Sequence, residues 1–178
     1  TAFDKPSMHG LVEKVGVDFL KLASGALCDP DLLLRARTWA RPGVPAIIIS
    51  TGAGTLQEVV EATGVLHPSP YAILQCTSLY PCPAERLNLL VIRRYRKQFP
   101  DTVIGFSDHE DGIGMAPVAF ALGARIFEKH VTLSHTAKGS DHAMSLEPEG
   151  QRRYVQALRN TPLALGDGVK RRYPEELP

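Results

Sequence analysis

Short runs of apolar, often β-branched residues alternate along this chain with longer segments whose apolar residues recur every three or four positions. Short apolar runs are typical of buried strands, and the longer period is typical of helices with one buried face. The short runs predict five strands, at 19–23, 46–49, 71–76, 103–106 and 125–127. The periodic segments predict helices at 6–15, 31–39, 55–63, 88–99, 115–122 and 148–165.

Several predicted helices carry end signals. Gly16 follows the first helix, and Pro42 with Gly43 follows the second, as expected where a helix stops. Thr55 and Glu58 have the spacing of a capping box, in which each side chain bonds to the backbone N–H of the other residue. These signals support the predicted boundaries.

Strands and helices alternate from one end of the chain to the other, with no Gly/Ser linker and no low-complexity tract. Alternation of this kind is typical of a parallel α/β protein. Repeats of roughly 25–30 residues match the βα unit of a (β/α)8 barrel. The sequence therefore predicts a parallel α/β fold built from barrel-type units.

Two neighbouring strand ends each carry a histidine. The run at 103–106 leads into Ser107, Asp108 and His109, and the run at 125–127 leads into Glu128, Lys129 and His130. The carboxyl ends of parallel strands meet at one edge of the sheet, where sites are built. We therefore expect His109 and His130 to share a metal ion. The alternative is that each histidine only packs or caps at its strand end.

Polar side chains follow the other strands as well. Hydroxyls, one lysine and backbone amides freed by glycine supply hydrogen-bond donors without excess charge, as a phosphate ester requires. The alternative for each serine is the N-cap of the next helix. The strand-end donors are Lys21, Ser24, Ser50, Thr51, Thr77, Ser78, Tyr80 and Ser107.

Composition narrows the choice of partners. Lysines and arginines number 20 against 19 acids, so no overall field attracts nucleic acid or an anionic membrane. No apolar run approaches the roughly 18 residues of a membrane span, and the N-terminal residues lack a signal pattern. Three cysteines without a C-x-x-C pair favour reduced thiols in a cytoplasmic protein.

Three further features of the sequence do not by themselves indicate a catalytic or binding site. The basic residues at 93–97 share a segment with a stripe of apolar residues, which predicts the solvated face of a helix. Cys76 and Cys82 have no histidine at a spacing that suggests a nucleophile, and we interpret them as structural. Asp141 and His142 lie in a long loop, 134–145, that either covers the site or remains in solvent.

An ordered set of motifs gives the chain a specific resemblance to the sialic acid synthase family. The set covers nearly the whole sequence, and its Gln-Cys-Thr-Ser and Lys-Gly-Ser-Asp-His segments resemble the animal-type synthases, which take a 6-phosphorylated sugar. The motifs are Lys21-Leu22-Ala23-Ser24-Gly25, Ser50-Thr51-Gly52, Gln75-Cys76-Thr77-Ser78-Leu79-Tyr80-Pro81, Gly105-Phe106-Ser107-Asp108-His109, Glu128-Lys129-His130, Lys138-Gly139-Ser140-Asp141-His142 and Ser145-Leu146-Glu147-Pro148.

This resemblance implies a TIM (β/α)8 barrel, of which the chain supplies about strands 4 to 8. The family condenses phosphoenolpyruvate with an N-acetylmannosamine-type aldehyde and releases phosphate. The resemblance implies that His109 and His130 hold a divalent metal, Mn or Mg, and that Tyr80 and Asp141 contact the sugar. The resemblance also implies that the catalytic residues are His109, His130, Lys21 and Asp141. Phosphoenolpyruvate would be held by Lys21, Ser24, Ser50, Ser78 and Ser107.

The sequence also departs from the family pattern. Ala26 stands where the family has an acidic residue close to its Lys-x-x-Ser motif. Residues 1–4 resemble the end of the third barrel strand, so the first strands, a family glutamate and a second phosphate-binding lysine are not in this sequence. The antifreeze-like domain of the family, which gives an arginine to the partner subunit's site, is also absent. We therefore expect a partial barrel from a parent that forms a homodimer.

Two other functions remain open. One is a related synthase that acts on the precursor of a legionaminic or pseudaminic acid. The other is a catalytically inactive relative that serves as a binding domain, an interpretation that the missing strands and Ala26 favour. Neither the sugar nor the metal is determined by the sequence.

Overall fold

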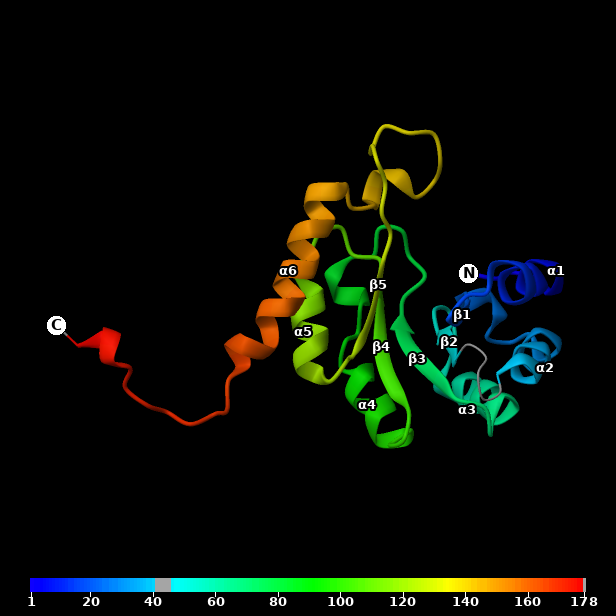
Figure 1. Ribbon diagram of the computed structural model, residues 1–178, viewed down its shortest axis with the longest axis horizontal. Coiled ribbons are helices and arrows are strands. Elements are labelled where there is room, and N and C mark those ends of the chain that lie inside the picture. Colours follow the sequence, from blue (N-terminus) through cyan, green and yellow to red (C-terminus); the bar gives the residue numbers. More distant parts are fainter. Residues whose placement is uncertain (41–45, 178) are drawn as a thin grey trace.

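The computed structural model describes residues 1–40 and 46–177 and contains a parallel sheet with barrel-type topology. All neighbouring strands pair in parallel, in the order β1-β2-β3-β4-β5. A doubly wound sheet would reverse this order at a switch point, whereas consecutive order is that of a barrel wall. Figure 1 shows the curved sheet. The strands are β1 (Phe19–Leu22), β2 (Ala46–Ser50), β3 (Tyr71–Cys76), β4 (Val103–Asp108) and β5 (Ile126–Lys129).

All five predicted strands are therefore confirmed, within one or two residues at each end. Residue 2 adds an isolated parallel bridge to β1, because Ala2 pairs with Leu22 and its N–H donates to the Lys21 carbonyl at 3.0 Å. This pairing continues the parallel order beyond β1.

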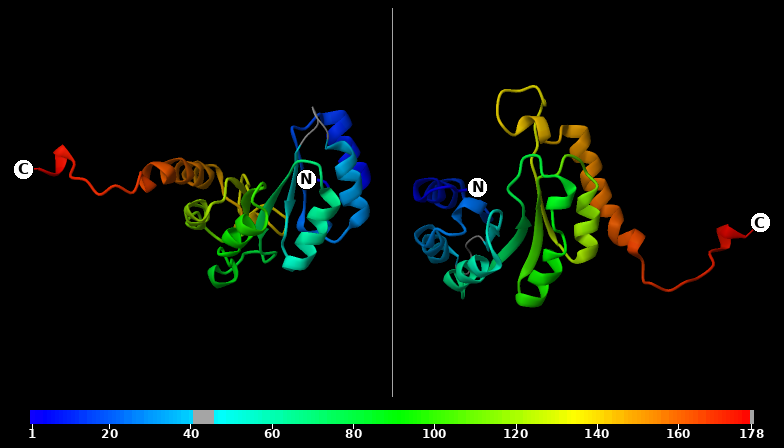
Figure 2. Two further views of the ribbon diagram at one scale, coloured as in Figure 1. Left: turned by 90° about the horizontal axis from the view of Figure 1, so that it is seen from below. Right: turned by 180° about the vertical axis from the view of Figure 1, so that it is seen from behind.

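The helices follow the sheet from α2 and α3 beside β1 and β2 to α5 and α6 beside β5 (Figures 1 and 2). The capping box of Thr55 and Glu58 is present at the start of α3. The predicted stop at Pro42 and Gly43 lies outside the described residues. The α-helices are α1 (Lys5–His9), α2 (Pro30–Trp39), α3 (Leu56–Leu66), α4 (Val91–Gln98), α5 (Met115–Leu122) and α6 (Pro148–Leu165).

Three predicted helices differ from the structure, and the simplest difference is that the third continues to Leu66 instead of ending at 63. The first is α-helical only to His9 and continues as a π-helix, Gly10–Val15, before Gly16 ends it with φ 70°. Apolar periodicity near 3.6 does not distinguish these two windings. The fourth begins at Val91 rather than at 88, because Asn88 adopts a left-handed conformation, with φ 46°, that does not continue a right-handed helix.

The hydrophobic core lies between the sheet and the helices. Phe106, Ile47 and Ile73 from the strands and Leu66 and Ile92 from the helices are fully buried in it. The basic segment of α4 has the predicted arrangement, with Ile92 and Tyr95 inward and the arginines and Lys97 exposed. In the described residues, no helix is both long enough and apolar enough to span a membrane.

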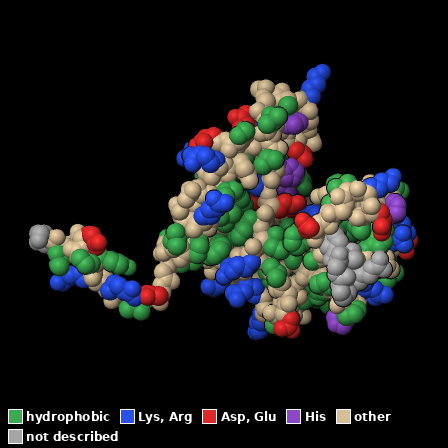
Figure 3. Space-filling model, viewed as in Figure 1, with side chains coloured by type: hydrophobic (Ala, Val, Ile, Leu, Met, Phe, Trp, Pro, Cys, Tyr) green, Lys and Arg blue, Asp and Glu red, His purple; other side chains and the backbone are tan. Residues whose placement is uncertain are grey.

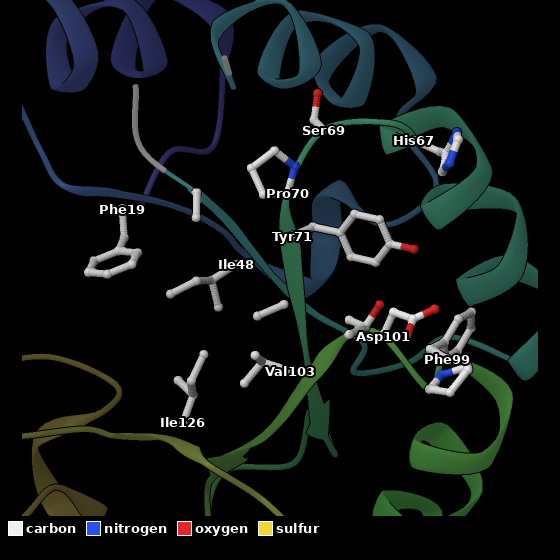
Figure 4. A pocket seen from close by; sticks show the side chains of 14 residues that line it. Phe19, Ile48, His67, Ser69, Pro70, Tyr71, Phe99, Asp101, Val103 and Ile126 are labelled. Atoms are coloured by element: carbon white, nitrogen blue, oxygen red, sulfur yellow. The ribbon is translucent and has the colours of Figure 1, made fainter. Parts of the chain in front are cut away.

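An apolar cavity of about 590 Å³ lies at the amino-terminal ends of the strands. Each strand contributes its first residue to the lining, and Figure 4 shows Phe19, Ile48, Val103 and Ile126 grouped on one side of β3 and Tyr71 extending to the other. These first residues are Phe19, Ala46, Tyr71, Val103 and Ile126. The cavity is at the opposite end of the sheet from His109 and His130, so it is not part of the predicted site.

We predict that the 178-residue polypeptide associates with itself or with another chain. Phe19 is 62% exposed and Val103 is 48% exposed on the cavity wall, and an apolar surface next to unpaired strand edges promotes association. Size-exclusion chromatography with light scattering measures the mass. A mass of one chain at every concentration would contradict the prediction.

Candidate functional site

Adjacent parallel strands bring the two predicted histidines together. Asp108 pairs with Lys129 in the β4–β5 register, so the next residue of each strand, His109 and His130, lies at the same end of the sheet. Their ring centroids are 5.2 Å apart, with the planes at 83°. The Tyr80 ring lies 4.2 Å from His109 and 5.8 Å from His130. Figure 3 shows histidine and acidic side chains gathered at this end of the molecule.

Each histidine is oriented by an oxygen acceptor. The Nδ1 atom of His109 lies 2.8 Å from the Thr77 carbonyl, and because a carbonyl only accepts, Nδ1 donates the proton. This tautomer leaves the lone pair on Nε2. The Nδ1 atom of His130 lies 3.4 Å from Asp141 Oδ2. A carboxylate or carbonyl behind the imidazole is the usual arrangement at metal-binding histidines.

The electrostatics of His130 favour the neutral imidazole that a metal requires. Burial, followed by repulsion from His109, lowers the pKa of His130, although Asp141 acts in the opposite direction. Burial alone would also lower the pKa of His109, but hydrogen bonds to Cys76 and to the Thr77 carbonyl raise it overall. The hydrogen bond to Cys76 thus contributes to the raised pKa of His109.

The donor set fits a divalent metal in part. Imidazole nitrogen is a ligand for Mn and for other divalent ions, and both rings are available at one point of the strand ends. Within residues 1–40 and 46–177, no group of three or more His, Cys, Asp and Glu side chains is placed to hold a metal ion. The described residues therefore offer two histidine ligands rather than a closed site.

A compact set of donors surrounds Gly52, after β2. The Gly52 N–H donates to Ser24 Oγ at 3.0 Å. A Cβ atom at position 52 would lie 2.1 Å from Ser78 Oγ, 2.8 Å from Ser24 Oγ and 3.0 Å from Cys76 Sγ. The Ser24 and Ser78 hydroxyls thus pack against the backbone of Gly52, where a larger residue would displace them, and these hydroxyls are candidate donors for an anionic group.

Lys21 and two further serines surround the carboxylate of Glu128. Lys21 Nζ lies 3.3 Å from Glu128 Oε1, and Ser50 Oγ donates to Glu128 Oε2 at 3.4 Å. Burial alone would raise the pKa of Glu128, but Lys21 and a hydrogen bond from Ser107 lower it overall, so the carboxylate is ionised. Ser107 Oγ is also 3.5 Å from His109 Nε2. Glu128 therefore links the predicted anion donors to the histidine pair.

The long loop reaches the site through one of its two candidate residues. Asp141 lies beside His130, and the Ser145 hydroxyl donates to the Asp141 carbonyl at 2.6 Å. His142 turns away and lies 2.7 Å from the Thr132 hydroxyl through its Nδ1 atom. The site-covering alternative is thus confirmed for Asp141 and not for His142.

The structural interpretation of Cys76 stays a prediction, but the structure adds a contact with the candidate site. Its Sγ atom lies 3.8 Å from His109 Nδ1 and accepts from Ser24 Oγ at 3.5 Å. Burial alone would raise the pKa of Cys76, but these two partners lower it overall. Cys82 is buried, its thiol donates to the Pro83 carbonyl at 3.6 Å, and its backbone N–H donates to the His109 carbonyl at 2.7 Å, contacts that agree with a structural role. Linear spacing did not reveal the Cys76 contact because β3 and β4 bring residues 33 positions apart together.

Comparison with known proteins gives consistent matches. Residues 1–170 match the sequence profile of the NeuB family. The chain is 39% identical over 169 residues to human N-acetylneuraminate-9-phosphate synthase, covering 93% of this chain and 46% of the human protein. It is 35% identical to the N,N'-diacetyllegionaminic acid synthase of Legionella pneumophila, covering 100% of this chain and 50% of that protein.

A solved structure shows the same fold. The N-acetylneuraminic acid synthetase of Leptospira borgpetersenii superposes with a TM-score of 0.84 at 31% identity, covering 98% of this chain and 60% of that one. The five parallel strands are therefore part of the TIM-barrel fold of this protein class. The chain spans about half the length of the curated relatives it matches.

Proposed function

The chain belongs to the NeuB family, and from that membership we propose that it carries the metal-binding and phosphoenolpyruvate-binding part of a nonulosonic acid synthase. The full reaction would join phosphoenolpyruvate to N-acetylmannosamine, or to its 6-phosphate, and release inorganic phosphate. The observation that carries the proposal is the convergence, on the same strand ends, of two imidazoles with a lysine and serine hydroxyls.

Phosphoenolpyruvate would bind beside these donors. Lys21 supplies a positive charge, and charge-assisted hydrogen bonds are the strong ones for phosphate and carboxylate. Ser24, Ser78 and the Gly52 amide surround one point of the site, and Ser50 and Ser107 surround the adjacent Glu128 carboxylate. In this proposal the anionic substrate competes with Glu128 for the Lys21 ammonium.

The metal would be held by His109 and His130, with further ligands from substrate, water or residues beyond those described. When bound, a divalent ion such as Mn²⁺ or Mg²⁺ would polarise the aldehyde oxygen of the sugar. The Thr77 carbonyl and the Asp141 carboxylate keep the two imidazoles in fixed orientations.

The sugar would lie against Tyr80 and Asp141. Tyr80 is half exposed beside both histidines, and the Asp141 side chain is partly open to solvent. The methylene carbon of phosphoenolpyruvate would attack the aldehyde carbon and form the new C–C bond. Water would then add to the cationic carbon, and the C–O bond to phosphate would break as phosphate leaves.

The direct test is product analysis with the full-length parent, phosphoenolpyruvate, Mn²⁺ and a panel of N-acylated hexosamines. Phosphate release together with a mass increase of the sugar supports the proposal. The identities to the human and Legionella proteins differ by only a few per cent, so the panel must include the legionaminic and pseudaminic precursors. Absence of product with every sugar would favour the binding-domain alternative.

We predict that Lys21→Met raises the dissociation constant of phosphoenolpyruvate at least about tenfold, or roughly 1.4 kcal/mol, by removing one charge-assisted contact. Isothermal titration calorimetry measures the affinity. Lys97→Met is the matched control, because Lys97 is exposed on α4. Equal affinities for Lys21→Met and the unaltered protein would show that Lys21 only neutralises Glu128.

The remaining assignments follow from the same family. We propose that residues 1–178 belong to one barrel domain, and that the full-length parent is a homodimer. The three free thiols fit a reducing compartment such as the cytoplasm.

A further inference from the structure

The residues next to the two histidines form a buried polar cluster on the opposite face of the sheet. Successive side chains of a strand point to opposite faces. Accordingly, Glu128 and His130 face the site, whereas Lys129, between them, pairs with Asp108, the residue before His109. We call Asp108, Glu110, Lys129 and Tyr154 the outer polar cluster.

The contacts of this cluster link the two residues that flank His109 in the sequence, Asp108 and Glu110, to Lys129. Lys129 Nζ lies 3.4 Å from Asp108 Oδ1 and also donates to the Glu110 carbonyl. The Glu110 N–H donates to Asp108 Oδ1 at 3.0 Å. One ammonium therefore holds the residues on both sides of His109, and it belongs to the residue that precedes His130.

Tyr154 of α6 packs against the outer polar cluster beside Asp108. It is 3% exposed, and burial together with the nearby Asp108 carboxylate raises its pKa far above the usual value. Its hydroxyl interacts with the Asp108 carboxylate, and neither the hydroxyl nor Asp108 Oδ2 has another hydrogen-bond partner in the described residues. Helix α6 thus places the Tyr154 side chain beside Asp108, the residue that precedes His109.

Stability alone does not account for this arrangement. The Lys129 and Asp108 side chains are 1% and 0% exposed, and the desolvation of two buried charges can outweigh their mutual attraction. Apolar side chains of similar volume often replace such pairs with no loss of stability. What an apolar pair lacks is direction, since an ion pair with hydrogen bonds fixes the register of two strand ends.

We propose that the outer polar cluster is a positioning device that fixes the separation and orientation of His109 and His130. Asp108, Lys129 and Tyr154 are then positioning residues that act through the histidines and touch no substrate. The inference rests on the proposed function, because it takes the two histidines as metal ligands. Residues that orient metal ligands typically contribute about 10–100-fold to metal affinity.

The test compares Mn²⁺ binding with folding in the full chain. The double variant Asp108→Asn with Lys129→Met removes both charges of the ion pair at nearly constant volume. We expect its Mn²⁺ dissociation constant, measured by electron paramagnetic resonance, to rise at least about tenfold while the unfolding midpoint changes little. A cluster that only fills space would leave Mn²⁺ affinity unchanged, and that result would overturn the inference.

A second variant keeps the inference testable if the double variant fails to fold. Tyr154→Phe removes only the hydroxyl and should weaken Mn²⁺ binding by about threefold at an unchanged unfolding midpoint; in that event, unaltered affinity would overturn the inference. His109→Ala distinguishes a failure of the proposed metal site from a failure of the positioning role. If His109→Ala leaves Mn²⁺ affinity intact, the proposed metal site is wrong; if only His109→Ala weakens it, the positioning role is wrong.

Discussion

Replacing His109 with alanine is expected to abolish metal-dependent condensation by the full-length parent and to weaken Mn²⁺ binding by more than about a hundredfold. Even residues that only orient a metal ligand typically contribute 10–100-fold, and His109 would be one of the two imidazole ligands that the described residues offer. Phosphate release, assayed against Mn²⁺ concentration, measures the loss. The fold should persist, because the ring lies at a strand end outside the hydrophobic core.

The control is His135→Ala. His135 is exposed in the long loop and contributes only its backbone N–H, to Glu147. This variant should have the Mn²⁺ titration of the unaltered protein. If His109→Ala gave the same titration as His135→Ala, the two-histidine metal site would be excluded.

Gly52→Ala is expected to reduce phosphoenolpyruvate affinity at least about a hundredfold, or roughly 2.7 kcal/mol. The new methyl group would lie 2.1 Å from Ser78 Oγ and 2.8 Å from Ser24 Oγ, so both hydroxyls must rotate away. Each hydrogen bond to a charged group contributes about 1.5–3 kcal/mol, and the substitution would remove two of them. Calorimetric titration with phosphoenolpyruvate measures the effect.

Gly64→Ala provides the matched control. Gly64 lies within α3, and a Cβ atom there meets nothing within 4 Å. We expect unchanged phosphoenolpyruvate affinity and equal or greater stability, because alanine is the better helix former. If Gly52→Ala bound phosphoenolpyruvate as well as Gly64→Ala does, the anion would not lie among Ser24, Ser78 and the Gly52 amide.

The barrel strands and the histidine pair could be predicted from sequence because local patterns determine them. The apolar run at 71–76 has the exact bounds of β3, and the period at 115–122 has the exact bounds of α5. Parallel pairing then requires His109 and His130 to lie together, since each follows the last residue of adjacent strands.

The contacts of Glu128 and Cys76 could not be predicted from the sequence. Glu128 contacts Lys21 from a strand more than 100 positions away, and Cys76 contacts His109 across β3 and β4. Such contacts depend on strand register and side-chain direction, which no local pattern encodes. The outer polar cluster also depends on register, because only the pairing of Asp108 with Lys129 brings their charges together.

The central claim is tested most directly by a crystal structure of the full chain soaked with Mn²⁺ and phosphoenolpyruvate, with data collected at the manganese absorption edge. The account predicts an anomalous peak within coordination distance of both His109 and His130, and phosphoenolpyruvate density beside Lys21 and Gly52. A manganese peak away from both imidazoles, or phosphoenolpyruvate bound elsewhere on the sheet, would contradict it.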